Sequence, residues 1–270
     1  MGVRRIVPVT ATNTNLIAGG AFAKGLEVVR KAFFNDHLPF EKALKRGQIE
    51  ALIYYEEHEP FGTSAVKNVW RTVTALSAYF QAYPIDALLT PVPLRNGKYA
   101  IEYSFAVPTQ VRSPETNDPI LYTGRYDMLG HSPEGTVFII DEKTSTQLGE
   151  SWAVQWRMNN QMTGYIWGSQ QSGLAVDWAC IRGLSFLTAG YGSCEVLTHR
   201  PKWRIEKFEE NLNLTLRTLV NAWQTNTWEQ NLGRTCADFG GCAYLTLCES
   251  KEPEEWIPLN FKENTWNPLH

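Results

Sequence analysis

Several residue patterns are missing from this chain, and each absence removes a class of function. Within the 270 residues, no apolar run reaches the length of about 18 residues that suggests a transmembrane helix, so no membrane partner is expected. Neither a G-x-x-x-x-G-K-[ST] sequence nor a G-x-S-x-G sequence is present, which removes the phosphate-binding P-loop and the nucleophile elbow of an α/β-hydrolase. The five histidines are scattered, and no two have the spacing of metal ligands.

Cysteine content and net charge are also low. The odd number of five cysteines, and a polar start that lacks the apolar core of a signal peptide, indicate a reduced, cytoplasmic protein. A net charge of −3 argues against binding to nucleic acid through bulk charge. Residues 1–48 nevertheless carry eight Lys or Arg against three acidic residues, which fits either a local phosphate-binding face or an ordinary solvated helix surface.

Aromatic residues, in contrast, make up 12% of the chain and include ten tryptophans. Trp152, Trp156 and Trp167 fall on or beside one expected helix. Rings of this kind stack on single-stranded bases in some nucleic-acid-binding proteins. The apolar spacing of these three favours the other interpretation, in which they pack inside the fold.

Periodicity predicts helices and strands in an order typical of a mixed α/β protein. Apolar residues at intervals of three and four predict helices over 16–35, 40–57, 63–83, 151–172 and 202–223. Short apolar runs predict strands over 87–94, 98–107, 176–187 and 193–199, with a polar loop over 108–119. We therefore expect an α/β fold with a mixed central β-sheet flanked by helices in a domain covering 1–225. A cysteine-containing C-terminal segment over 226–270 is expected to pack on it.

The most informative stretch is 122–143, where two alternating apolar runs flank the polar turn 131–135 and predict a β-hairpin. Asp127 lies late in the first expected strand, and Asp141 and Lys143 end the second. Because side chains alternate along a strand, Asp141 and Lys143 share one face. Two carboxylates on adjacent strands beside an amine are an arrangement that can hold a divalent cation and a water.

This arrangement fits hydrolysis of a phosphodiester, which needs charge neutralisation and an activated water. Asp127 and Asp141 offer the hard oxygens that Mg²⁺ or Mn²⁺ prefers, and the backbone carbonyl of Glu142 is expected near the same ion. Lys143 is the candidate for orienting or deprotonating the water. Glu102, on the preceding strand, is either a further carboxylate ligand or a solvent-facing strand residue.

Gln161 and Tyr165 follow on the next expected helix and share one of its faces. The blocks Gly124-Arg-Tyr-Asp127, Asp141-Glu-Lys143 and Gln161-x-x-x-Tyr165 together resemble the RecB-like branch of the PD-(D/E)XK nuclease superfamily, including CRISPR-associated-type exonucleases, over about residues 15–250. The resemblance implies a restriction-endonuclease-like core and metal-dependent cleavage of DNA. It also implies that Asp127 and Asp141 are metal ligands, that Lys143 is the catalytic lysine, and that Gln161 and Tyr165 position the substrate backbone or the site.

One position departs from the family pattern. Members usually carry a metal-reaching histidine on an early helix, whereas the matching position here is Ala23, which cannot bind a metal. Weaker metal binding, a substitute ligand such as Glu27, or loss of activity are the alternatives.

Three cysteines, Cys236, Cys242 and Cys248, are regularly spaced in the C-terminal segment. Thiolates at such spacing bind Zn²⁺ or an iron–sulfur cluster, and the family resemblance implies a 4Fe-4S cluster with a fourth, N-terminal cysteine. That cysteine is missing, because Cys180 and Cys194 fall in expected strands and are expected to pack as small apolar residues. The alternative is a segment with free thiols.

The sequence thus predicts a Mg²⁺- or Mn²⁺-dependent deoxyribonuclease. We expect an exonuclease acting on single-stranded DNA or duplex ends in replication, recombination or repair, with a possible protein partner from those pathways and a phage or prokaryotic origin. The alternative is a catalytically impaired relative that binds nucleic acid or a partner protein, which Ala23 and the missing fourth cysteine favour. A purely structural use of the fold is the third possibility.

Overall fold

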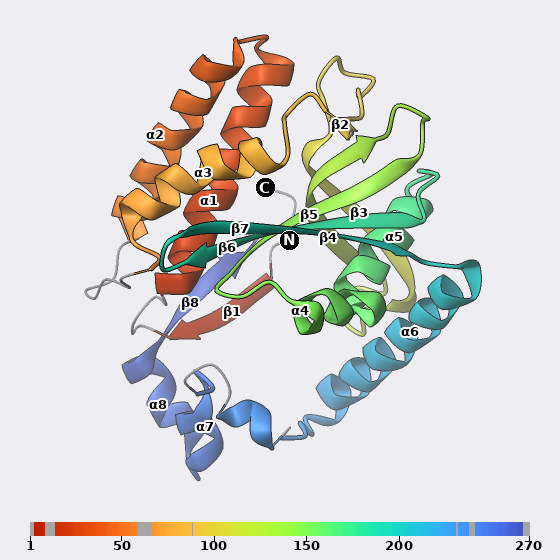
Figure 1. Ribbon diagram of the computed structural model, residues 1–270. Helices are drawn as coiled ribbons and strands as arrows, with labels where there is room; N and C mark the ends of the chain where they lie inside the picture. The colour runs from red at the N-terminus through yellow and green to blue at the C-terminus, as the bar shows by residue number, and fades with distance from the viewer. Residues whose placement is uncertain are drawn as a thin grey trace. The chain divides into compact units, whose positions relative to one another are not determined.

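The computed structural model describes residues 3–8, 14–58, 66–87, 89–230, 232–237 and 241–266 (Figure 1). The chain divides into two compact units. The larger contains residues 12–108 and 121–211, and the smaller contains 1–11, 109–120 and 212–270. None of the helices in the described part of the chain is long and apolar enough to cross a bilayer.

A six-stranded mixed sheet forms the middle of the larger unit. Its strands follow the order β2-β4-β5-β6-β7, and β3 also pairs with β4. Strands β5 and β6 are parallel, while β2–β4, β4–β5 and β6–β7 are antiparallel. The bounds are β2 Thr90–Pro91, β3 Ile101–Arg112, β4 Pro119–His131, β5 Val137–Ser145, β6 Trp178–Leu187 and β7 Gly190–His199.

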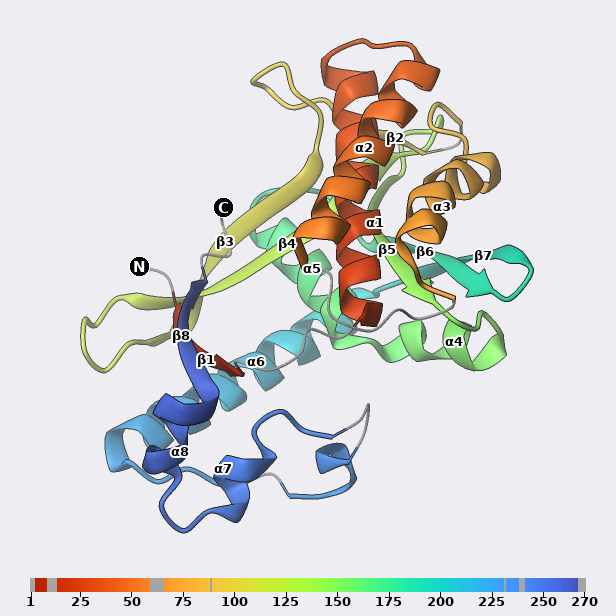
Figure 2. The same ribbon diagram turned by 90° about the vertical axis from the view of Figure 1, so that its left-hand side faces the viewer.

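Helices cover both faces of this sheet, with α1, α2 and α3 on one face and α4 and α5 on the other (Figures 1 and 2). The fold is therefore α/β with a curled mixed sheet flanked by helices, as the sequence predicted. The bounds of the helices, including short π and 3₁₀ turns, are α1 Thr14–Arg30, η1 Lys31–Asn35, α2 Phe40–His58, α3 Val69–Ala82, α4 Glu150–Val154, η2 Gln155–Met158, α5 Asn160–Gln171 and α6 Lys202–Thr225.

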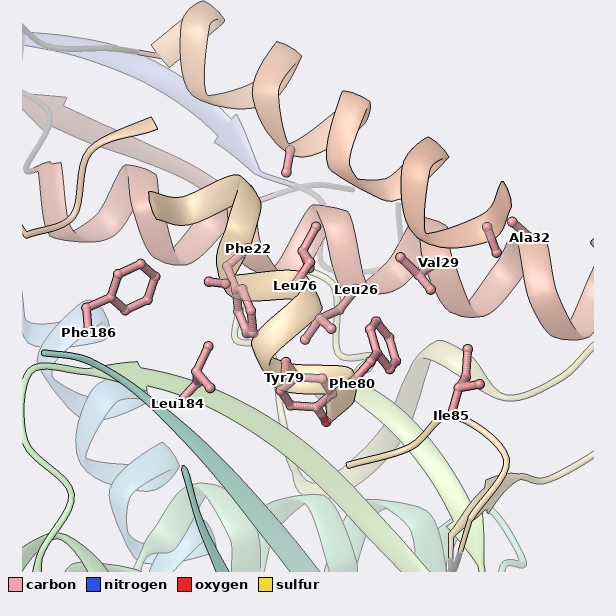
Figure 3. Close-up of a cluster of buried hydrophobic side chains, with 13 residues drawn as sticks. Phe22, Leu26, Val29, Ala32, Leu76, Tyr79, Phe80, Ile85, Leu184 and Phe186 are labelled. Atoms are coloured by element: carbon pink, nitrogen blue, oxygen red, sulfur yellow. The ribbon is translucent and has the colours of Figure 1, made fainter. Parts of the chain in front are cut away.

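The main core lies between the sheet and the first helix layer (Figure 3). One face of α1 buries Phe22, Leu26 and Val29, and α3 meets it with Leu76 and Tyr79. Burying an aliphatic or aromatic side chain of this kind stabilises the fold by roughly 1.5–3 kcal/mol. This packing fixes α1 and α3 over the strands that carry the candidate site.

Small residues let α1 and α2 approach closely. Ala43, Gly47 and Ala51 recur every fourth residue on the buried face of α2. A Cβ at Gly47 would stand 2.6 Å from the carbonyl oxygen of Gly25 and would overlap Val29. The contact between the two helices therefore depends on glycine at this position.

Within the smaller unit, β1 Val3–Pro8 pairs antiparallel with β8 Phe261–Trp266, so that Val3 faces Trp266. Tyr244 and Phe261 stack with ring centroids 5.6 Å apart. The remaining elements are η3 Arg234–Cys236, α7 Leu245–Glu249 and α8 Pro253–Asn260. The sequence predicted neither this strand pair nor the two short helices. The proposed division at residue 225 stays a prediction.

Several predicted boundaries were wrong. The expected helix over 151–172 is broken at Asn159, whose backbone is extended and whose side chain caps α5. The expected strand 87–94 is reduced to Thr90–Pro91. The expected loop 108–119 is half strand, because β3 continues to Arg112 and β4 begins at Pro119. The start of the helix predicted over 63–83 lies partly outside the described residues, and α3 begins at Val69.

Candidate active site

Strand β5 presents two faces with different chemistry. Its alternation directs Asp141 and Lys143 to one side of the sheet and Glu142 to the other. Asp141 is 3% exposed, whereas the side chain of Lys143 is 33% exposed. The buried carboxylate and the more accessible amine therefore lie at the same end of one strand.

Lys143 and Asp141 form an ion pair, with Lys143 Nζ 2.6 Å from Asp141 Oδ2. This buried oxygen accepts no well-formed hydrogen bond among the described residues. Burial raises the pKa of Asp141, although the Lys143 ammonium opposes this shift. Burial tends to lower the pKa of Lys143, but the Asp141 charge outweighs it and leaves the pKa raised, so the amine is protonated at neutral pH.

Asp127 comes from the adjacent strand β4, next to the pair Met128–Ile140 that joins β4 to β5. Its Oδ2 accepts a hydrogen bond of 2.5 Å from the backbone N–H of Glu142. Withdrawal of the carboxyl group from water, followed by repulsion from Glu142 and Asp141, raises the pKa of Asp127 well above its usual range. In the described part of the chain, no lysine or arginine forms an ion pair with Asp127.

Gln161 and Tyr165, one turn apart on α5, are joined by a hydrogen bond of 2.9 Å from Gln161 Nε2 to Tyr165 Oη. Burial raises the pKa of Tyr165, and the charge of Asp141 adds to this shift. The hydroxyl of Tyr165 is therefore close enough to Asp141 for the carboxylate charge to shift its pKa. Asp127, Asp141, Lys143, Gln161 and Tyr165 therefore lie close to one another, and their roles in metal binding and catalysis stay predictions.

The side chain of Glu142 is held away from that neighbourhood. Its carboxylate accepts hydrogen bonds from Arg30 at 2.5 and 3.0 Å and from Tyr79 at 2.9 Å. Burial would raise the pKa of Glu142, but the Arg30 guanidinium holds it at about 2. Only the backbone carbonyl of Glu142 remains for the predicted role beside a metal.

Sequence reasoning missed Arg30 and Tyr79. They lie 112 and 63 residues from Glu142, so no local pattern links them. One signal was present, because Arg30 continues the apolar stripe of Phe22, Leu26 and Val29 that faces the core. A charged residue on such a stripe indicates a buried partner elsewhere in the chain.

Glu102 lies on β3 and pairs with Arg125 on β4, with Arg125 Nε 3.2 Å from Glu102 Oε2. Burial raises the pKa of Glu102 to about 7 despite this partner. Its backbone has a φ of 53°, in the left-handed region that residues with a Cβ rarely occupy. Strain of this kind is concentrated at functional sites, and the predicted role of Glu102 as a further ligand stays a prediction.

Around Ala23, α1 carries charged residues that pair with one another. Glu27, one turn further on, accepts hydrogen bonds from Lys24 at 3.0 Å and from Lys31 at 2.6 Å. Its carboxylate is therefore already neutralised by two cations. This pairing weakens the idea that Glu27 substitutes for the histidine usually found at the position of Ala23.

The chemistry of the strand site fits a divalent cation. Two carboxylates converge from adjacent strands, their pKa values are raised, and the one described cation paired with them is Lys143. Mg²⁺ commonly binds through one or two carboxylates and keeps several waters. Among the described residues, no group of three His, Cys, Asp or Glu side chains is arranged to hold a metal, so further ligands would have to be backbone carbonyls and waters.

The C-terminal cysteines show no such fit. Cys236, Cys242 and Cys248 are free thiols, and Cys242 and Cys248 are exposed. Within the described ranges they form no candidate metal cluster. Cys180 is fully buried in β6, as expected of a small apolar residue, and Cys194 is half-buried.

The three tryptophans considered for base stacking are buried, with exposed fractions of 9% for Trp152, 6% for Trp156 and 2% for Trp167. Trp152 and Trp156 pack edge to face with ring centroids 5.5 Å apart. The packing interpretation is confirmed, since none of these rings is available to a base.

Of three comparisons with known proteins, one identifies a family. A model of the PD-(D/E)XK nuclease superfamily matches residues 37–249, a range that begins after Ala23. Among solved structures, the one titled "Crystal structure of SSO0001" is 11% identical, covering 76% of this chain and 79% of that chain with a TM-score of 0.33. That score is too low to support an argument. No match was found among curated proteins.

Proposed function

The chain belongs to the PD-(D/E)XK nuclease superfamily, and from this premise we propose that it is a Mg²⁺- or Mn²⁺-dependent deoxyribonuclease. The observation that carries the proposal is the convergence of Asp127, Asp141 and Lys143 just beyond the Met128–Ile140 pair of β4 and β5. Asp127 and Asp141 would hold the metal. When bound, such an ion stabilises negative charge on a phosphate and lowers the pKa of a coordinated water.

The residues of this chain supply the other requirements. Lys143, protonated through its pairing with Asp141, neutralises charge on the phosphate and orients a water beside that carboxylate. Tyr165 and Gln161 present a phenol and an amide from α5 to the same region, where they position the sugar–phosphate backbone. Because Asp141 is buried, little bulk solvent screens its charge, which strengthens these interactions.

The finer assignment is an exonuclease of the RecB-like branch that acts on single strands or duplex ends in replication, recombination or repair. It rests on the spacing of the Gly124–Asp127, Asp141–Lys143 and Gln161–Tyr165 blocks. A 4Fe-4S cluster or Zn²⁺ at Cys236, Cys242 and Cys248 belongs to the same assignment, although their arrangement gives it no support.

The test is degradation of end-labelled single- and double-stranded DNA, linear and circular, in Mn²⁺. Lys143→Ala removes the amine and is expected to lower the rate by about 10²–10³-fold, the usual cost of losing a group that stabilises charge in the transition state. The variant should keep its fold, as circular dichroism can check, but should unfold at a lower temperature than the wild type, because the buried Asp141 carboxylate loses the one described cation paired with it. Digestion of linear DNA alone would support the exonuclease.

The second candidate is a catalytically impaired relative that binds nucleic acid, which Ala23 favours because it removes a potential metal ligand. The same experiment separates the two. If the wild type and Lys143→Ala degrade DNA equally slowly while both retain DNA in a filter-binding assay, the nuclease proposal is wrong and the binding role stands.

A further inference from the structure

A buried charge network lies on the face of β5 that points away from Asp141 and Lys143. Arg30 of α1 donates two hydrogen bonds to the carboxylate of Glu142, at 2.5 and 3.0 Å. Tyr79 of α3 donates a third at 2.9 Å and accepts one from Arg30 at 3.0 Å. The side chains of Arg30 and Glu142 are 4% and 2% exposed, so all three groups are closed off from water.

This network is joined to the candidate site through a single peptide group. The backbone N–H of Glu142 donates to Asp127 Oδ2, while the side chain of the same residue is clamped by Arg30 and Tyr79. Any rotation of Glu142 would move its N–H and change the direction of the Asp127 carboxylate. The network therefore acts on the strand site without touching a substrate.

Stability alone does not account for an ion pair at this place. Ile140, two residues earlier on the same face of β5, is fully buried against an apolar cluster. Withdrawing a guanidinium and a carboxylate from water is costly, and apolar residues of similar volume often serve a core equally well. The ion pair instead fixes the orientation of the Glu142 carboxylate, because a bidentate guanidinium and a phenol bond it in only one direction.

We propose that Arg30, Tyr79 and Glu142 are positioning residues that fix the peptide of Glu142 and, through it, the Asp127 carboxylate in the orientation needed for metal binding. This inference rests on the proposed metal-dependent hydrolysis. It assigns a role to the residue between Asp141 and Lys143 and to two residues on the helices above β5.

The decisive variant is the double substitution Arg30→Met with Glu142→Leu. It removes one positive and one negative charge, so the net charge around Asp127 and Asp141 is unchanged. It leaves no buried charge unpaired, which either single substitution would do. A weaker metal affinity that is accompanied by faster hydrogen exchange of the amide at position 142 therefore reports the orientation of Asp127.

Two measurements test whether the network positions Asp127. Binding of Mn²⁺ alone, measured by the loss of the free-ion electron paramagnetic resonance signal, should weaken by about 10–100-fold, the usual effect of removing a group that orients a metal ligand. Hydrogen exchange of the backbone amide at position 142, measured by nuclear magnetic resonance, should accelerate because the peptide is no longer held. The temperature of unfolding should fall by a few degrees, because the buried hydroxyl of Tyr79 loses its partners Arg30 and Glu142.

Two further variants control for folding. Tyr79→Phe removes one hydrogen bond, keeps the ion pair, and should weaken Mn²⁺ binding less than the double substitution does; it also decides the question if the double variant fails to fold. Arg71→Met removes a clamp from α3 to three carbonyls of the β6–β7 turn, Leu187, Thr188 and Gly190. It should lower stability and leave Mn²⁺ affinity unchanged.

The inference is overturned if the double variant matches the wild type both in Mn²⁺ affinity and in hydrogen exchange of the amide at position 142. If the double variant does not fold, the same result for Tyr79→Phe overturns it. Failure of the proposed function has a different signature. If the wild type neither binds Mn²⁺ nor cleaves DNA, the nuclease proposal fails. In that case, hydrogen exchange of the amide at position 142 is the one measurement that still shows whether the network holds this peptide.

Discussion

Gly168, on α5, is a residue at which the absence of a side chain sets the position of the candidate site. A Cβ there would overlap the ring of Phe105, a buried residue of β3. Four residues earlier, a Cβ at Gly164 would overlap Tyr122 and would stand 2.9 Å from Cζ of Phe208. The two glycines let α5 approach the strands, and this approach brings Tyr165 near Asp141.

Gly168→Ala is therefore expected to lower the free energy of unfolding by about 1–3 kcal/mol, the cost of overpacking a close contact. Urea denaturation measures this difference. Gly19→Ala, in α1, is the matched control because its Cβ would meet only Thr144 Oγ1, at an ordinary 3.4 Å. Replacing a helical glycine without a clash should stabilise the protein by up to about 1 kcal/mol. Equal effects of the two substitutions would contradict the packing argument.

At the scale of elements, the start of α5 is held by an arginine from the end of β7. Arg200 is 2% exposed, and within the described part of the chain it donates no hydrogen bond to a carboxylate. Its acceptors are neutral: the hydroxyls of Thr163 and Thr198 and the carbonyls of Trp156, His199 and Asn159. Asn159 in turn caps α5 by accepting from the N–H groups of Gln161 and Met162.

Arg200→Lys keeps the charge but cannot reach all of these acceptors, because an ammonium has no planar fork of donors. We expect the free energy of unfolding to fall by about 2–3 kcal/mol, since buried carbonyls lose their donors. Chemical denaturation provides the measurement. Arg46→Lys, at an exposed pair with Asp36, should change stability by less than about 1 kcal/mol. A similarly small effect at Arg200 would show that its hydrogen bonds are dispensable.

Elements defined by local periodicity were predictable, and those defined by distant contacts were not. The period of two in 136–143 is enough to place Asp141 and Lys143 on one face of a strand. The break at Asn159 was missed because Trp152 and Trp156 continue a helical spacing up to it. The pairing of β1 with β8 joins Val3 to Trp266, and no local pattern encodes such a pair.

The same division applies to the candidate site. The strand period relates Asp141 to Lys143 and the helix period relates Gln161 to Tyr165, whereas the family resemblance grouped these two pairs with Asp127. Arg30 and Tyr79 escaped notice, because their link to Glu142 exists only after α1 and α3 have packed over the sheet. The sequence could not show that Arg30 would neutralise Glu142, or that no lysine or arginine in the described part of the chain would pair with Asp127.

At the scale of the whole molecule, the candidate site lowers the free energy of unfolding. All its residues belong to the larger unit. Asp127 and Asp141 repel each other there, and burial deepens the cost of both charges. Proteins commonly accept such local destabilisation where function requires it. A ligand that neutralises the pair should therefore stabilise the folded unit as a whole.

We expect Mn²⁺ at about 100 times its dissociation constant to add about 2.7 kcal/mol to the free energy of unfolding, by mass action. For a domain of roughly 150–250 residues this raises the unfolding temperature by about 5–10 °C, which calorimetry resolves.

Asp127→Asn removes the repulsion and keeps an oxygen for the N–H of Glu142. It should unfold at a higher temperature than the wild type in chelator, yet gain nothing from Mn²⁺. Asp36→Asn, at an exposed ion pair, should retain the full Mn²⁺ effect. A wild-type protein that gains no stability from Mn²⁺, or an Asp127→Asn variant that gains as much as the wild type, would be incompatible with a metal held by this carboxylate pair.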